Sequence, residues 1–139
     1  MANILLIEDN PGDVLLTKEA FKECPISHTI YTVKDGIEAL NFLKKEGEFN
    51  GAERPDLILL DLNLPKKDGR EVLAEIKKDD NLKGIPVIIL STSKNEIDIQ
   101  KTYELKANCY ISKPVELDSF FKIIAELNHF WFKISSLPE

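Results

Sequence analysis

The chain alternates short aliphatic runs with longer segments of helical periodicity, and this order constrains the fold more than any other feature of the sequence. Runs rich in aliphatic and β-branched residues predict strands at 3–8, 28–33, 56–61, 86–91 and, more weakly, 108–112. The first, third and fourth runs are almost continuous in Leu, Ile and Val, which is typical of parallel strands covered on both faces. We therefore expect a parallel sheet at the centre of the molecule.

The segments after these runs carry apolar residues at spacings of three and four, which is typical of amphipathic helices. They lie at 13–24, 35–45, 68–78, 95–106 and about 116–134. Pro11, Asn95 and two Asp-Gly pairs favour helix starts at the expected places. Alternating strands and helices predict an α/β fold, a flavodoxin-like, doubly wound five-stranded sheet of order 2-1-3-4-5 flanked by five helices. A length of 139 residues suits a single domain over 1–139, with a short tail at 135–139.

Composition excludes several classes of function. The formal net charge of -6 comes without a long like-charge block, which argues against nucleic acid as a partner. The apolar runs are much shorter than the roughly 20 residues that cross a membrane. Cys24 and Cys109 lie far apart without a CxxC pattern, and no secretory signal opens the chain. We expect a cytoplasmic protein whose cysteines are small core residues.

Two segments depart from the repeating pattern. The polar stretch 46–55 contains Gly and Pro and predicts an open loop before the third strand. The last helix carries one apolar stripe that can cover the sheet, made of Leu117, Phe120, Phe121, Ile124, Leu127 and Trp131. A second stripe needs another partner and consists of Ile123, Phe130 and Ile134. We expect a homodimer through Phe130, Trp131 and Ile134.

Three carboxylates follow predicted strands that should be neighbours. Glu8 and Asp9 come after the first strand, and Asp61 comes after the third, at the point where the strand order reverses. Two such charges about 4 Å apart repel by roughly 4 kcal/mol at an effective dielectric near 20, so the cluster calls for a cation. Oxygen ligands without His or Cys favour Mg²⁺, or Mn²⁺, over zinc.

Two further strand ends supply complementary groups. Ser91 closes the fourth strand, and Lys113 closes the fifth, immediately before Pro114. A metal, an ammonium and a hydroxyl around a carboxylate can neutralise the oxygens of a phosphoryl group in transfer. Asp61 would then be the nucleophile that forms an aspartyl phosphate. A cis peptide at Lys113–Pro114 would aim the lysine inward.

Other functions are compatible with parts of this pattern. A haloacid-dehalogenase-type phosphatase also uses an aspartyl nucleophile, but it requires a second Asp two residues later, where this chain has Asn63. A flavin carrier of the same architecture would cradle a phosphate after its first strand, where EDNPGD (8–13) places repelling carboxylates. A binding module with an unused acceptor remains open.

The combined marks resemble the receiver domain of two-component response regulators. They are Glu8-Asp9, the Asp61 of DLNLPKKDG, the Ser91 that closes PVIILS, and the Tyr110 and Lys113 of YISKP. The length and the ending HFW are most similar to the single-domain receivers of the bacterial phytochrome response regulator type.

This resemblance implies a role in phosphorelay signal transduction. Asp61 would accept phosphate from a sensor histidine kinase, and the narrower resemblance implies one of the phytochrome type. Magnesium, or manganese, would be bound by Asp9, Asp61 and the backbone carbonyl of Asn63, with Glu8 nearby or acting through a water. Lys113 would pair first with Asp61 and then with the phosphoryl group.

The resemblance also implies how the signal leaves the domain. Ser91 would hydrogen-bond a phosphoryl oxygen, and its movement would be coupled to rotation of Tyr110. Such a domain is not an enzyme in the usual sense, although it assists its own phosphorylation and dephosphorylation. No effector domain follows Glu139 in this sequence, so we expect output through a downstream protein target or a phosphate relay.

Overall fold

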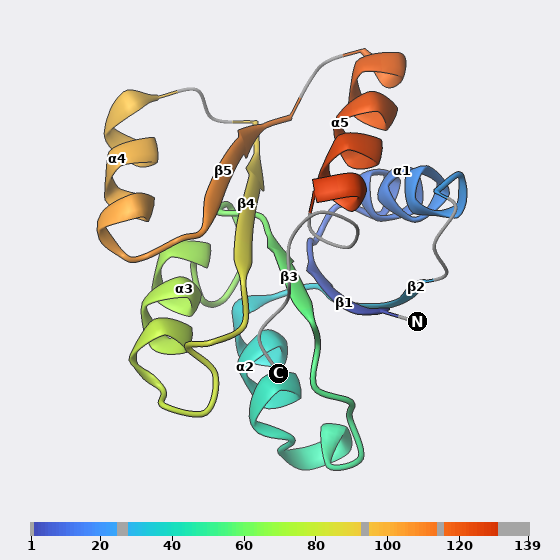
Figure 1. Ribbon diagram of the computed structural model, residues 1–139. Coiled ribbons are helices and arrows are strands. Elements are labelled where there is room, and N and C mark those ends of the chain that lie inside the picture. The colour runs from blue at the N-terminus through green and yellow to red at the C-terminus, as the bar shows by residue number, and fades with distance from the viewer. Residues whose placement is uncertain (1, 25–27, 93–94, 114–115, 131–139) are drawn as a thin grey trace.

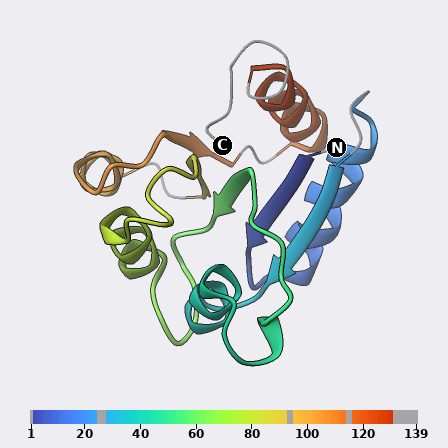
Figure 2. The same ribbon diagram turned by 60° about the horizontal axis from the view of Figure 1, so that its bottom comes forward.

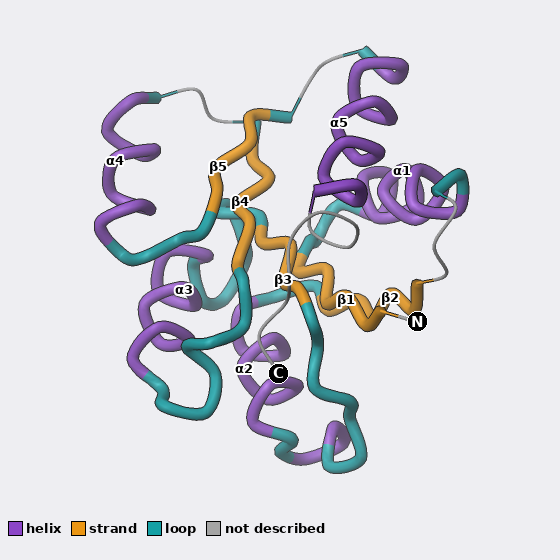
Figure 3. Tube along the Cα trace, viewed as in Figure 1, coloured by secondary structure: helices purple, strands orange, loops and turns teal. Residues whose placement is uncertain are grey.

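A computed structural model describes residues 2–24, 28–92, 95–113 and 116–130. The strands form one parallel sheet of order β2-β1-β3-β4-β5 (Figure 1; Figure 3). Their bounds are β1 (Ala2–Ile7), β2 (His28–Val33), β3 (Leu57–Leu60), β4 (Val87–Ser91) and β5 (Cys109–Ser112). The expected fold class and strand order are therefore confirmed.

The helices cover both faces of this sheet, as Figure 2 shows. Their bounds are α1 (Pro11–Lys22), α2 (Gly36–Lys44), α3 (Gly69–Lys78), α4 (Glu96–Glu104) and α5 (Leu117–His129). The helices α1 and α5 pack on one face, and α2 and α3 pack on the other, with α4 beside β5. The expected end of the last helix near residue 134, with Trp131, Ile134 and the tail, lies outside the described residues.

Capping side chains place the start of four helices at the carboxyl ends of the strands. Each accepts a backbone N–H from the first turn, at 2.8–3.1 Å, and the caps are Asn10, Asp35, Asp68 and Asn95. A cap of this kind typically contributes about 1 kcal/mol to stability. These helices begin within two residues of the expected positions, because each starts directly after its capping residue.

The strands of the sheet bury alternate side chains in two core layers. Leu5, Ile58 and Ile89 face the layer beneath α2 and α3, whereas Ile4, Leu59 and Ile88 face the layer beneath α1 and α5. Residues 57–60 are fully buried, because β3 is central and helices cover both of its faces. The end of β3 is thereby fixed in space, which determines where Asp61 can lie.

Two expectations about the periphery need correction. The periodicity predicts Leu117 on the sheet-covering stripe, but Leu117 is 53% exposed because it lies in the first turn of α5, beyond the edge of the core. The loop at 46–55 is not wholly open, since Gly47–Phe49 forms a 3-10 turn and the Phe49 ring packs 5.5 Å from that of Phe42. Phe120, Ile124 and Leu127 are buried as expected.

Cys24 and Cys109 are free cysteines and are half-buried. They pack against the layer beneath α1 and α5, but they are not the fully buried core residues that the sequence predicts. Among the described residues, none of the helices combines the length and the apolar character that a membrane crossing requires.

Candidate functional site

Three carboxylates meet where β1 and β3 end. Ligand oxygens of Glu8, Asp9 and Asp61 all lie within 4.8 Å of one another. The neighbouring strands hold them in place, because the Asp61 N–H donates to the carbonyl of Ile7 and the Glu8 N–H donates to that of Val33, each at 3.0 Å. The convergence that the sequence predicted is confirmed, and it follows from the adjacency of β1 and β3.

Burial changes the acidity of Glu8. Its side chain is 4% exposed, and burial, reinforced by nearby Asp61 and opposed by Lys113, raises the pKa of the Glu8 carboxyl to about 7. A buried carboxylate beside others of the same charge is stabilised by any added positive charge. The site therefore favours a cation over an additional anion.

Lys113 brings the one ammonium that contacts this cluster among the described residues. Its Nζ donates to Glu8 Oε1 and to Asp13 Oδ2, the latter at 3.1 Å, and lies 3.8 Å from Asp61 Oδ2. Burial lowers the pKa of this ammonium, but the hydrogen bond and charge of Glu8, with Asp61 and Asp13, raise it overall. The expected pairing with Asp61 is a longer contact, and Glu8 is the closer partner.

Asp13 was missed by sequence reasoning. It lies in the first turn of α1, where an acid is also common for its effect on helix stability. The signal that could have identified it is the EDNPGD stretch itself: Asn10 caps a helix that starts immediately after Asp9, so the first turn must face the same strand ends.

The loop after β3 folds back onto the Asp61 carboxylate. The exposed Asn63 donates its backbone N–H to Asp61 Oδ1 at 3.2 Å. Gly69 begins α3 directly behind this loop, and a Cβ there would lie 2.4 Å from the carbonyl oxygen of Asp61. A glycine is therefore required for α3 to approach the site so closely.

The remaining predicted residues lie on β4 and β5. Ser91 is fully buried at the end of β4, and its carbonyl accepts the backbone N–H of Lys113 at 2.6 Å. Tyr110 is half-buried against the layer beneath α2 and α3 and donates its backbone N–H to the Tyr103 hydroxyl at 3.0 Å. Ser91 thus lies at the same edge of the sheet as the carboxylates. The Lys113–Pro114 peptide, with its expected cis bond, lies outside the described residues.

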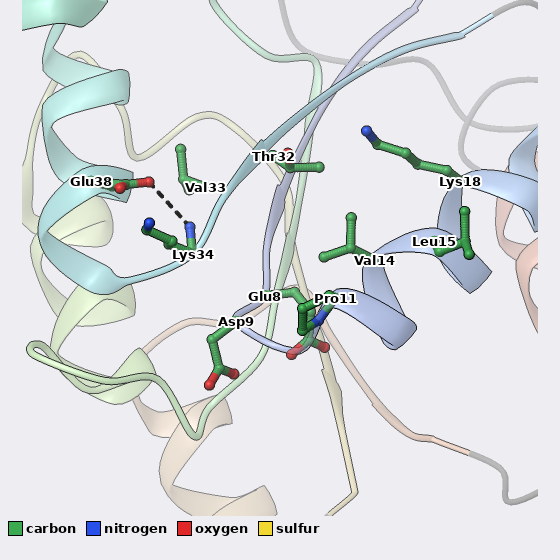
Figure 4. A pocket seen from close by; sticks show the side chains of 10 residues that line it. All are labelled: Glu8, Asp9, Pro11, Val14, Leu15, Lys18, Thr32, Val33, Lys34 and Glu38. Carbon is green, nitrogen blue, oxygen red and sulfur yellow. Dashed lines mark hydrogen bonds between the residues drawn. The ribbon is translucent and has the colours of Figure 1, made fainter.

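A groove of about 440 Å³ leads away from Glu8 and Asp9 between α1 and the turn from β2 to α2 (Figure 4). Its walls combine apolar side chains with lysines and an acid, and are formed by Pro11, Val14, Leu15, Lys18, Thr32, Val33, Lys34 and Glu38. No periodic pattern in the sequence predicts this groove, because its walls come from separate elements. It reaches Glu8 and Asp9 from the side of α1 and does not include Asp61.

Comparison with known proteins shows which family the chain belongs to. The response regulator receiver domain matches residues 4–125. The chain belongs to the response regulator receiver family. The resemblance seen in the sequence is thereby confirmed, and phosphorylation by a histidine kinase is the general function of this family.

The phytochrome response regulators are among the most similar relatives. Response regulator Rcp1 of Synechocystis sp. is 49% identical over 135 residues, which cover 97% of this chain and 92% of that protein. The Mn²⁺-bound crystal structure of Rcp1 superposes with a TM-score of 0.95 at 47% identity over 100% of both chains. The phosphorylated cyanobacterial phytochrome response regulator RcpA gives 0.96 at 53% identity, with 99% of each chain covered.

A more distant receiver domain also bears on the metal. That of the sensor histidine kinase PA1611 from Pseudomonas aeruginosa PAO1, with a magnesium ion coordinated in its active site cleft, is 26% identical. It superposes with a TM-score of 0.71 over 90% of this chain and 95% of that one.

Proposed function

We propose that Asp61 accepts a phosphoryl group from a sensor histidine kinase and that this change switches the contacts of the domain with a downstream protein. The observation that carries the proposal is the meeting of Asp61 with two further carboxylates and the buried ammonium of Lys113 at one edge of the sheet. The match of residues 4–125 to the receiver family supports it.

The donor set fits a hard divalent cation. Glu8, Asp9 and Asp61 offer only oxygen atoms, close enough together for one ion, and the exposure of Asp9 leaves room for water ligands. Asp9, Asp61 and the Asn63 carbonyl would bind Mg²⁺ or Mn²⁺, with Glu8 supporting them directly or through a water. The bound cation would neutralise charge that develops on the phosphoryl oxygens.

Transfer would proceed by attack of an Asp61 carboxylate oxygen on the phosphorus of a phosphohistidine. The new P–O bond forms as the P–N bond breaks, and the imidazole leaves with its electron pair. Lys113 would move from Glu8 and Asp61 to the incoming phosphoryl oxygens, and the Ser91 hydroxyl would donate to another. The same groups would assist hydrolysis of the acyl phosphate, so the domain would promote its own dephosphorylation.

The partners follow from the proposed chemistry and the relatives. A kinase of the phytochrome type is the proposed donor, since RcpA is a phytochrome response regulator. We place the protein in the cytoplasm, where such kinases draw on ATP, as one receiver domain over residues 1–139. A homodimer through the last helix is supported by the 51% exposure of Phe130, and its other expected residues, Trp131 and Ile134, lie outside the described part of the chain.

Incubation with acetyl phosphate and magnesium, followed by intact-mass measurement, tests the central proposal. One added phosphoryl group is expected, and Asp61→Asn should abolish it. Asp56→Asn is the matched control, because Asp56 lies at the opposite end of the same strand and should leave the adduct unchanged. A folded, cation-binding protein without the adduct would contradict the proposal and favour the binding module.

Light scattering tests the dimer separately. A mass that stays monomeric at high concentration, with and without phosphorylation, would contradict the role of the last helix.

A further inference from the structure

The loop that joins β3 to α3 contains two of the proposed cation ligands and touches the start of α2. Asp61 and Asn63 lie in this loop, and a Cβ on Gly36 would sit 2.2 Å from the carbonyl oxygen of Lys67. The two backbones are therefore in direct contact, and α2 and α3 lie side by side on one face of the sheet (Figure 2). A shift of the backbone at the start of α2 would therefore displace the loop.

A carboxylate at the start of α2 connects the two segments. Asp35 Oδ1 accepts the backbone N–H of Glu38 at 2.8 Å and caps the helix, while its Oδ2 lies 3.6 Å from Lys66 Nζ. The Asp35 side chain is only 3% exposed, so its position is fixed by packing. One buried carboxylate thus both caps α2 and pairs with the loop.

Lys66 holds its ammonium near Asp35 from a left-handed backbone, a conformation that Lys45 and Lys106 also adopt. Its φ of 65° lies in the left-handed region, which is unfavourable for a residue with a Cβ and which glycine adopts freely. A lysine at this position keeps the unfavourable conformation. It supplies an ammonium facing Asp35 that glycine would lack.

We propose that Lys66 and Asp35 are positioning residues for the cation site. Their ion pair holds the β3–α3 loop against α2, and thereby holds Asp61 and Asn63 in place to bind the ion. Neither residue is a proposed ligand, and both act through the loop. The inference rests on the proposed function, because it assumes that these loop residues bind Mg²⁺ or Mn²⁺.

Titration calorimetry of the metal-free protein with Mn²⁺ tests the proposal without any measurement of phosphorylation. Lys66→Gly removes the ammonium and relieves the left-handed backbone, so the fold is kept. Asp35→Asn removes the charge and retains a good capping side chain. Each variant should weaken Mn²⁺ binding about two- to fivefold, the range expected for a partly exposed ion pair. The double variant should bind no more weakly than the weaker single variant.

Lys45→Gly is the matched control. Lys45 also has a left-handed backbone, with φ 56°, at the end of α2, away from the Asp35 pair. It should bind Mn²⁺ like the wild type. Wild-type affinity in Lys66→Gly, or an equal loss in Lys45→Gly, would overturn the proposal, as would a fall in melting temperature with unchanged affinity.

The proposed function fails separately. If the wild type binds Mn²⁺ and forms the Asp61 adduct but Lys66→Gly matches it in affinity, only the positioning role is lost. A wild type that binds no Mn²⁺ would overturn both.

Discussion

A lysine that is largely removed from solvent lies at each edge of the sheet, one where the parallel strands begin and one where they end. The first contacts neutral oxygen atoms, whereas the second contacts carboxylates. At the edge where the strands begin, Lys77 Nζ donates to two backbone carbonyls and to Asn108 Oδ1, at 2.9–3.3 Å. At the edge where they end, Lys113 faces a group of carboxylates that includes Glu8 and Asp61. Burial lowers the pKa of Lys77, whereas the acids raise that of Lys113 against the effect of burial.

The polar groups at the first edge satisfy one another, whereas the charges at the second edge do not balance. At the first edge Asn108 also accepts the backbone N–H of Val87, and Asp56 accepts that of Asn3, each at 2.8 Å, so these polar groups complete the ends of strands. The second edge gathers more acids than one ammonium can balance, and their mutual repulsion opposes folding. A bound divalent cation would offset this excess negative charge.

Replacing the lysine at each edge by alanine should have the largest and most different effects. Lys113→Ala should lower the rate of Asp61 phosphorylation at least about 100-fold, because a preorganised positive group at the phosphoryl oxygens is lost. Lys77→Ala should leave that rate unchanged and lower the free energy of unfolding by about 1–3 kcal/mol, since its acceptors lose their donor. Intact-mass time courses and urea unfolding measure the two effects. Similar phosphorylation losses in both variants would contradict the separation.

Magnesium should stabilise one edge only. At a concentration 100 times its dissociation constant, an ion that binds the folded state alone raises the free energy of unfolding by about 3 kcal/mol. Asp9→Asn should remove most of this gain, and Asp56→Ala should keep it. Urea unfolding with Mg²⁺ and with a chelator provides the measurement, and an equal gain in both variants would place the ion elsewhere.

The pH dependence of the metal-free protein should come from the acidic edge. The pKa of Glu8 is raised from 4.5 to about 7 by burial, so the folded state binds a proton that the unfolded state releases earlier. Its contribution is complete below pH 4.5 and is lost as the pH rises through about 7, a change on the order of 1–3 kcal/mol. Unfolding with a chelator across this range should show the slope in wild type. Glu8→Gln should flatten it, and an unchanged slope would assign it to other groups.

The smallest effect is expected at the start of β3. Asp56→Ala removes the acceptor of the Asn3 N–H and should lower the free energy of unfolding by about 1 kcal/mol. Phosphorylation of Asp61 should not change, although only one short strand separates the two aspartates. A phosphorylation defect in this variant would show that the two edges are coupled.

The fold could be predicted from sequence because local and global signals agree. Residues 57–60 are apolar at every position, and they are fully buried in a central strand. The meeting of Glu8, Asp9 and Asp61 follows from strand order alone, since adjacent parallel strands end at one edge.

The partners and conformations of individual side chains could not be predicted from the sequence. The preference of Lys113 for Glu8 and Asp13 depends on the path of a long side chain across the site, which no spacing encodes. The left-handed backbone of Lys66 has no signal either, because lysine is not a residue that turns select. The exposure of Leu117 depends on where α5 begins to cover the core, a property of packing rather than of periodicity.

The segment 46–55 connects α2 to β3, at the edge where the strands begin, with the acidic cluster at the other end of the same strand (Figure 1). Residues 57–60 are fully buried between the two ends of β3, so we expect a change in length at the exposed Gly51 to leave Asp61 in place. This segment is therefore the natural insertion point for a fluorescent or affinity reporter. A tag placed there would follow the protein in a cell from the end of the sheet opposite the acidic cluster.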